Sequence, residues 1–210
     1  MKHSLRARRA PRAGFTLIEI LAVIVILALL AGALLTAYAP LTGSVEIETQ
    51  RKDLLMISAA IESFENDEGD YPPSTFPTAR LADGGGMNRG IECLVSYLWS
   101  DGREGLGLDA DTLVNTDGDR ARQSVSDLGT RDLLEIVDQW NNPVAYIHNA
   151  DYGDEFTYIT WDEQGQEIES VVRARQNPNT KSYYKRMGFQ LISAGPDGLF
   201  DTDDDVTNFQ

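Results

Sequence analysis

The chain has 210 residues, which is room for one globular domain together with an attachment segment. It carries 33 acidic against 18 basic residues, a net charge of −15, and so acidic a surface repels phosphate backbones. We therefore expect no nucleic-acid partner. A single cysteine excludes an internal disulfide, and two histidines are too few for a histidine-rich zinc site.

Signatures of catalysis are missing from the sequence. No glycine-rich phosphate loop follows a predicted strand, and no Gly-x-Ser-x-Gly elbow occurs. Nothing in the pattern favours Cys93 and His148 as a nucleophilic pair, and Cys93 is typical of a small apolar residue on a helix. We predict that the protein is not an enzyme.

Residues 1–14 form a basic leader, and an apolar segment follows it. The basic residues of the leader are Lys2, Arg6, Arg8, Arg9 and Arg12, whereas every acidic residue of the chain lies after position 14. As a helix, residues 15–39 would rise about 37 Å, enough to cross the hydrocarbon of a bilayer. The basic leader would hold the N-terminus in the cytoplasm and leave everything after residue 39 outside.

Three interpretations of this segment are open. A secretory signal peptide would be cleaved after Ala39, but Pro40 suits a peptidase poorly and the apolar stretch exceeds the usual length of about 7–15 residues. The second interpretation is a plain transmembrane anchor. The third is cleavage after Gly14, inside the basic end of the segment.

Glu19 favours the third interpretation, because a lone carboxylate at the centre of a bilayer costs about 2.5–3.5 kcal/mol. Cleavage after Gly14 would give Phe15 an N-terminal amine four residues from Glu19. Between staggered neighbouring helices, the amine of one subunit can meet the carboxylate of the next. Such a buried polar pair sets the register of a helical bundle.

The order of these features resembles the class III signal of type IV pilins and pseudopilins. The matching stretch is Gly-Phe-Thr-Leu-Ile-Glu at 14–19, after a short basic leader and before about twenty apolar residues. The resemblance implies that a prepilin peptidase of the bacterial inner membrane cuts between Gly14 and Phe15, and that the Phe15 amine is N-methylated. Cleavage would leave 13 basic against 33 acidic residues, a net charge of −20.

An amphipathic helix is predicted after the apolar segment. We expect a bend or local melting at Pro40 and Gly43. The apolar positions then recur every three or four residues, at Leu54, Ile57, Ile61 and Phe64, while Glu46, Glu48, Arg51, Lys52 and Glu62 stay polar. This pattern indicates a helix packed on a small sheet, ending near 66–70, with an extended exit at 71–73.

The rest of the chain predicts an α+β domain over residues 40–210. Short helices are expected at 91–100 and 130–139, and strands at 144–148, 156–160 and 187–193. Turns are expected at 141–143 and 195–198. Segments 74–90 and 101–128 lack periodicity and are predicted to be long loops.

The same order of elements resembles the major pseudopilin of type II secretion over nearly the whole chain. The matching stretches are 68–72, 89–94, 138–143 and the tail from Gly188 onward, although Gln139 and Asn141 depart from the family's Asp-Pro-Trp-Gly-Asn-Pro. The resemblance implies a pilin-like fold, with a long N-terminal helix packed on a small antiparallel sheet. It also implies a homopolymer that meets other pseudopilins and the inner-membrane secretion platform in exporting folded proteins.

Two alternative functions are open. The first is a type IV pilin for adhesion or motility, although extended pilins often carry a C-terminal disulfide that one cysteine cannot form. The second is a monomeric, membrane-tethered module that binds calcium or another ligand.

The acidic tail at 193–205 predicts a calcium site. Asp201, Asp203 and Asp205 alternate along a glycine-containing turn, and calcium takes six to eight oxygen ligands. The major pseudopilin binds calcium in a loop after its last strand. The resemblance therefore implies carboxylate ligands from Asp197, Asp203 and Asp205 and a backbone oxygen from Leu191 or Ser193, with Asp201 and Asp204 as further candidates. A solvated acidic tail is the alternative.

A second acidic stretch, 109–119, superficially resembles a calcium loop. An EF-hand places a bidentate glutamate at its twelfth position, and twelve from Asp109 is Arg120. We expect this stretch to be a loop of solvated acids.

Overall fold

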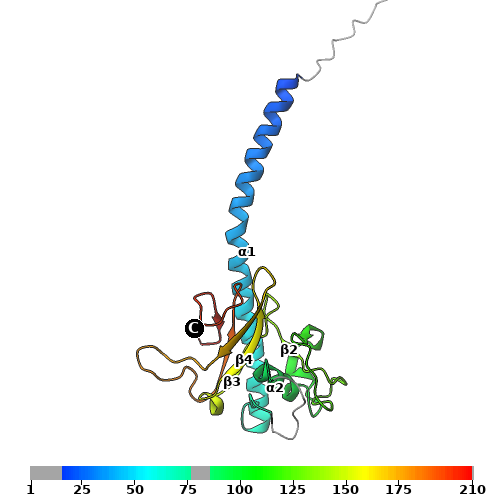
Figure 1. Ribbon diagram of the computed structural model, residues 1–210, viewed down its shortest axis with the longest axis vertical. Helices are drawn as coiled ribbons and strands as arrows, with labels where there is room; N and C mark the ends of the chain where they lie inside the picture. The colour runs from blue at the N-terminus through cyan, green and yellow to red at the C-terminus, as the bar shows by residue number, and fades with distance from the viewer. Residues whose placement is uncertain (1–15, 77–85, 210) are drawn as a thin grey trace, which may run out of the picture. The chain divides into compact units, whose positions relative to one another are not determined.

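The computed structural model describes residues 16–76 and 86–209, and it describes no side chain between 33 and 43. The chain divides into two compact units, Met1–Ser44 and Val45–Gln210. Helix α1 (Leu17–Glu68) begins in the first unit and ends in the second (Figure 1). Its backbone is helical through Pro40 and Gly43, so the local melting that we expected there does not occur.

The second unit buries one face of α1. Leu54, Ile57, Ile61 and Phe64 are at most 5% exposed, whereas the five polar residues predicted for the outer face are exposed. Gln50, on the same buried face, accepts a hydrogen bond from the backbone N–H of Gln139 at 3.0 Å. The predicted amphipathic helix is therefore confirmed, and it ends at Glu68 as expected.

Three small antiparallel sheets lie in the described part of the second unit. Strands β1 (Leu113–Val114) and β2 (Glu135–Ile136) form one pair, and β4 (Phe156–Trp161) and β5 (Glu167–Val172) form another. The third sheet has the order β3-β6-β7, from β3 (Ala145–His148), β6 (Phe189–Ser193) and β7 (Val206–Thr207). Ala145 lies opposite Ile192, and Ser193 lies opposite Val206. The predicted α+β organisation is confirmed.

The prediction of a helix at 130–139 is wrong. Glu135 and Ile136 instead form β2, and Asp138 shapes the turn that follows. Its Oδ1 accepts hydrogen bonds from the N–H groups of Trp140 at 3.0 Å and Asn142 at 2.9 Å. Its Oδ2 accepts one from Ser193 Oγ at 2.7 Å, so this buried carboxylate joins the turn to β6. An aspartate that satisfies local N–H groups stabilises a turn in place of a helix.

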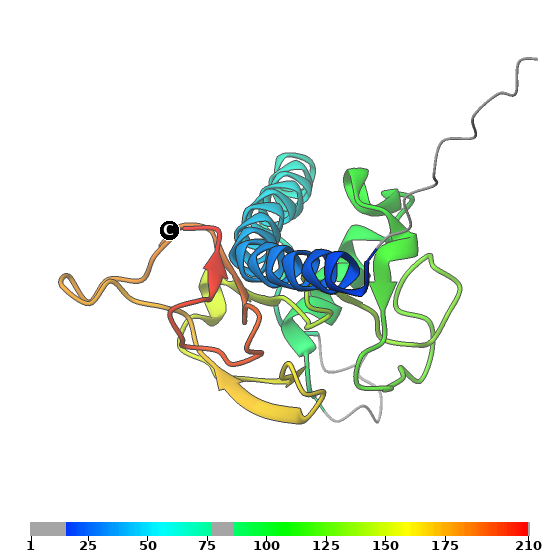
Figure 2. The same cartoon turned by 90° about the horizontal axis from the view of Figure 1, so that it is seen from above.

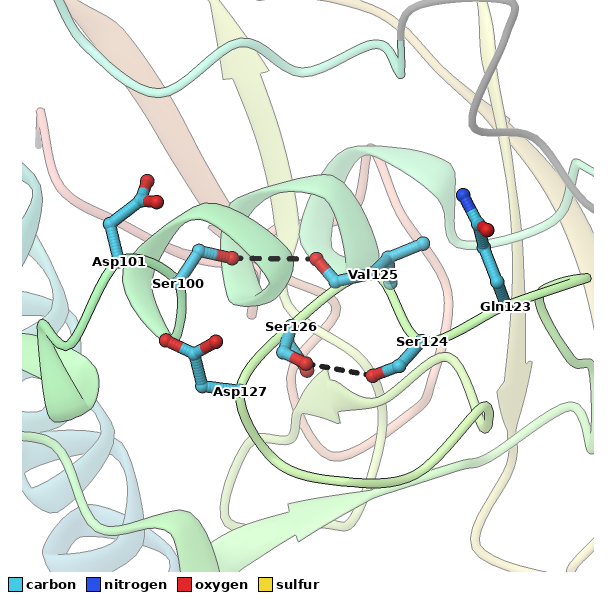
Figure 3. A pocket seen from close by; sticks show the side chains of 7 residues that line it. All are labelled: Ser100, Asp101, Gln123, Ser124, Val125, Ser126 and Asp127. Atoms are coloured by element: carbon cyan, nitrogen blue, oxygen red, sulfur yellow. Dashed lines mark hydrogen bonds between the residues drawn. The ribbon is translucent and has the colours of Figure 1, made fainter.

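The segment 101–128 is more ordered than a long loop. It contains the 3₁₀ turns η1 (Glu104–Gly107) and η2 (Ala110–Thr112), and then β1. Asp127 connects the segment to the end of helix α2 (Arg89–Leu98). Its backbone N–H donates to the carbonyl oxygen of Trp99, and its Oδ2 accepts from the Gly102 N–H. Figure 3 shows the small polar pocket formed where residues 123–127 lie beside Ser100.

Helix α2 packs tightly on β3 and β4. A Cβ atom at Gly90 would lie 2.2 Å from the carbonyl oxygen of Tyr146 and 2.6 Å from the Tyr158 hydroxyl. That hydroxyl accepts a hydrogen bond from the Tyr146 N–H at 3.1 Å. The close approach needs a glycine, since the Tyr146 carbonyl belongs to β3, a strand that is buried along its whole length. Cys93 on the same helix is buried beside Phe76, as its small apolar character predicted.

We expect Gly90→Ala to lower the free energy of unfolding by roughly 1–3 kcal/mol, because overpacking displaces the buried strand β3. Denaturant unfolding of the detergent-solubilised chain measures the change. Gly153→Ala is the control, since a Cβ there meets open space. Equal stability of the two variants would contradict the packing described for Gly90.

Candidate functional site

Helix α1 begins with a reciprocal capping arrangement between Thr16 and Glu19. The Glu19 carboxylate accepts hydrogen bonds from the Thr16 N–H at 2.8 Å and the Thr16 hydroxyl at 2.7 Å. The Thr16 hydroxyl oxygen in turn accepts from the Glu19 N–H at 3.3 Å. Such a capping box satisfies N–H groups that the first turn of a helix leaves without partners.

The capping box gives Glu19 a role within its own subunit that we did not predict. The signal was present in the sequence as threonine followed three residues later by glutamate. The predicted cleavage residues Gly14 and Phe15 lie outside the described residues. The partner that we predicted for Glu19, the amine of a neighbouring subunit, therefore stays a prediction.

The first turns of α1 expose apolar side chains on every side. All large apolar side chains between Leu17 and Leu30 are 50% to 85% exposed. A helix that is apolar all round is stable only when lipid or protein covers it. Within the described residues, no helix combines the length and the apolar character needed to cross a membrane.

Two carboxylates of the acidic tail form ion pairs with an arginine. The Arg175 guanidinium pairs with the Asp205 carboxylate and lies 3.2 Å from Asp201 Oδ1. The Asp205 side chain is only 1% exposed, and the Thr202 N–H donates to its Oδ2 at 3.1 Å. Burial raises the pKa of Asp205, while the hydrogen bond from Arg175 opposes that rise. Asp205 Oδ1 is buried and has no hydrogen-bond partner among the described residues.

The other predicted calcium ligands already have partners or face solvent. Asp197 Oδ1 accepts from the Leu199 N–H at 2.8 Å, and Asp204 Oδ2 accepts from the Asp197 N–H at 3.3 Å. The Leu191 carbonyl accepts from the Asn208 N–H at 3.3 Å, Ser193 pairs with Val206 in the sheet, and Asp203 is exposed. In the described part of the chain, no three tail carboxylates bring their oxygen atoms within 4.8 Å of one another.

A different set of carboxylates does come together. Three carboxylate oxygen atoms lie within 4.8 Å of one another. They belong to Glu92 of α2, Asp117 after β1 and Glu135 of β2. The carboxylate of Asp119 lies beside that of Glu92, and its negative charge raises the pKa of Glu92. We call Glu92, Asp117, Asp119 and Glu135 the buried acidic cluster.

Hydrogen bonds hold the Glu135 carboxylate in place. The amide nitrogen of Asn88 donates to Glu135 Oε1 at 3.3 Å, and the Thr116 N–H donates to Oε2 at 2.8 Å. Asn88 also accepts from the Ile159 N–H at 3.0 Å, which links the cluster to β4. The expectation that 109–119 is wholly solvated is therefore wrong for Asp117 and Asp119, which are half-buried, and correct for Asp109 and Asp111.

Burial and mutual repulsion shift the titration of the buried acidic cluster. Desolvation, with Asp119 as the next cause, raises the pKa of Glu92 to about 10. Desolvation raises the pKa of Glu135 to about 8 and that of Asp119 to about 7, with Asp117 adding repulsion in both cases. Without a cation, the folded cluster therefore retains protons near neutral pH.

Comparison with known families bears on the first turns of α1. A model of the prokaryotic N-terminal methylation motif matches residues 9–35. The N-terminal segment is a prepilin-type methylation motif. The motif is that of the type IV pilin-like class, whose members are inner-membrane-anchored, generally non-enzymatic subunits that a prepilin peptidase processes and that polymerise. No curated protein and no solved structure matches the chain.

The pilin-like motif ends at residue 35, before both acidic regions begin. The match therefore implies nothing about the chemistry of the tail or of the buried acidic cluster.

In a chelating buffer we expect the melting temperature to fall by several degrees as the pH rises from about 5 to about 9. The raised carboxyl pKa values mean that the folded state binds more protons than the unfolded state in this range, so stability is lost as the pH rises through them. Thermal melts of the detergent-solubilised chain measure the slope. Glu92→Gln should flatten it, and an unchanged slope in that variant would contradict the assignment.

Proposed function

We propose that the chain is a structural subunit of a type II secretion pseudopilus, which polymerises through its N-terminal helix and supports the export of folded proteins. The observation that carries this proposal is the methylation motif at 9–35 at the start of a helix whose apolar side chains are exposed on every side. In a filament, neighbouring helices would cover those side chains. Cleavage between Gly14 and Phe15, with methylation of Phe15, would release the subunit for assembly.

The proposed subunit crosses the inner membrane once through residues 15–39. Its N-terminus is cytoplasmic, and its domain at 40–210 lies in the periplasm. Other pseudopilins and the inner-membrane secretion platform are its proposed partners, together with further copies of itself. A single cysteine and an acidic tail favour this role over that of an adhesive or motile type IV pilin.

The proposed role of Glu19 is to pair with the amine of Phe15 in a neighbouring subunit. The capping box offers a competing explanation for its presence, because it uses the same carboxylate. Glutamine at position 19 separates the two roles. It retains an oxygen that accepts from Thr16, but it removes the negative charge.

We expect Glu19→Gln and Glu19→Ala both to lower filament yield by more than about tenfold, since an amine buried without its partner costs about 3–5 kcal/mol. Intact mass should show a chain beginning at methylated Phe15 in both variants, which separates processing from assembly. Glu46→Gln is the control, because Glu46 is exposed on the same helix. Normal assembly of Glu19→Gln beside failure of Glu19→Ala would assign Glu19 to capping alone.

Secretion assays in cells that lack the chain test whether it serves a secretion pseudopilus or a type IV pilus. We expect folded cargo to accumulate in the periplasm while surface adhesion and motility are unchanged. Normal secretion with lost adhesion or motility would favour a type IV pilin. A retained leader and a monomeric chain would favour a membrane-tethered binding module.

We propose further that the tail binds calcium through Asp197, Asp203 and Asp205, with a backbone oxygen of Leu191 or Ser193 and with Asp201 and Asp204 as additional candidates. The buried Oδ1 of Asp205, which has no hydrogen-bond partner in the described part of the chain, supports this assignment. Arg175 already neutralises Asp201 and Asp205 in part. Calcium and Arg175 would therefore act on the same carboxylate, and the tail would depend on calcium more strongly without Arg175.

Chelation should lower the melting temperature of the wild-type chain and lower that of Arg175→Gln further. A site of about 10⁻⁴–10⁻³ M affinity, at a calcium concentration ten times the dissociation constant, stabilises the fold by about 1.4 kcal/mol. Asp197→Ala with Asp203→Ala should remove one calcium ion from the stoichiometry measured by calorimetry. Arg173→Gln is the control for Arg175, since the described ion pair of Arg173 is with Glu155 and not with a carboxylate of the tail. An unchanged stoichiometry in the tail variant would leave the acids as solvated surface.

A further inference from the structure

The buried acidic cluster differs from the tail in that its described neighbours include no residue that forms an ion pair with it. Across 16–76 and 86–209, no lysine, arginine or histidine forms an ion pair with any of its four carboxylates. The tail, in contrast, has Arg175. Carboxylates that converge away from water repel one another unless a proton or a cation lies between them.

Glu92 is the residue that indicates a ligand. It is only 3% exposed, and its Oε1 has no hydrogen-bond partner among the described residues. Both carboxylate oxygens of Asp119 are likewise buried without a partner. Buried acceptors of this kind are rare in folded proteins, and an ion or water usually satisfies them. Glu92 and Asp119 lie close enough to share a hydrogen bond, but only while one of them carries a proton. When both are ionised, a cation is needed to satisfy their oxygen atoms.

We propose that Glu92, Asp117 and Glu135 bind a divalent cation, with Asp119 supplying a fourth carboxylate. All the available donors are oxygen atoms, which suits hard cations. Calcium fits best, because it accepts carboxylates in one- or two-oxygen modes and takes six to eight oxygen atoms. Magnesium usually keeps several water molecules, and the buried side chains of Glu92 and Glu135 leave little room for them.

Hydrogen bonds hold the Glu135 carboxylate in a fixed orientation before any cation binds. Asn88 is fully buried, and it connects Glu135 Oε1, the Thr116 hydroxyl at 3.0 Å and β4 through Ile159. Hydrogen bonds that fix the orientation of a ligating carboxylate strengthen metal binding. Each hydrogen bond uses one lone pair of Glu135, so both of its oxygen atoms can still contact a cation.

The site would join the segment 101–128 to helix α2. Asp117 and Asp119 come from the loop after β1, whereas Glu92 lies in the first turn of α2. Figures 1 and 2 show this segment, in green, and the C-terminal tail, in red, on opposite sides of the second half of α1. A cation bound at the cluster is therefore separate from one bound at the tail, and each can be removed without the other.

Calorimetry with CaCl₂ on the detergent-solubilised full chain tests the proposal. In the tail variant Asp197→Ala with Asp203→Ala, we expect one calcium ion to remain bound. Adding Glu92→Gln with Glu135→Gln should weaken that remaining site by at least about tenfold. Asp109→Asn with Asp111→Asn is the matched control, since these exposed acids lie in the same segment and should leave binding unchanged.

A second measurement does not depend on a variant of the cluster. Calcium should slow hydrogen exchange of the backbone amides of 113–119 in the tail variant, where the cluster is intact. No bound calcium in the tail variant, or an affinity unaffected by the two glutamine substitutions in a folded chain, would overturn the proposal. Equal exchange with and without calcium would also overturn it and would indicate that Glu92 and Asp119 share a proton.

Discussion

The globular part depends on the apolar stripe of helix α1. Its strands are two to six residues long in the described structure, and they form sheets of two or three strands. Sheets this small are marginal in water unless a helix covers one face. Leu54, Ile57, Ile61 and Phe64 supply that cover, and the sheets in turn bury the stripe. Neither α1 nor the sheets would be stable without the other.

Periodic patterns allowed helix α1 and strand β6 to be predicted from the sequence. Stretches whose residues suit both a helix and a strand could not be assigned correctly. The stripe on α1 repeats every three or four residues, and β6 is a short apolar run beside turn residues, so both were found. The stretch Leu-Leu-Glu-Ile-Val at 133–137 suits a helix as well as a strand, and only the bonds of Asp138 decide against the helix. Strand β5 was not predicted. It places Glu167 and Glu169 on an exposed face and has no long apolar run like that of β6.

The two acidic regions differ in how far the sequence could predict them. The tail is acidic along one continuous stretch, which a sequence shows directly, but Arg175 beside it comes from a distant part of the chain. Glu92, Asp117 and Glu135 are separated in sequence, and the pairing of Val114 with Glu135 is what brings them together. Glu92 in particular resembled an ordinary polar residue of a short helix. Its buried position follows from the tight packing of α2, which only the tertiary structure reveals.

The order of strands in the third sheet governs when the domain can fold during synthesis. Among the described strands, β3 pairs with β6 alone, since Ala145 lies opposite Ile192 and His148 opposite Phe189. Pairings between residues so far apart in sequence form slowly, because a long loop must close before any contact compensates for it. The ribosome completes β3 well before it reaches β6, so the nascent chain passes through a stage in which β3 has no partner strand and its apolar residues cannot yet be buried. Until β6 has been made, the third sheet cannot close, so this part of the core stays open through most of the synthesis of the chain.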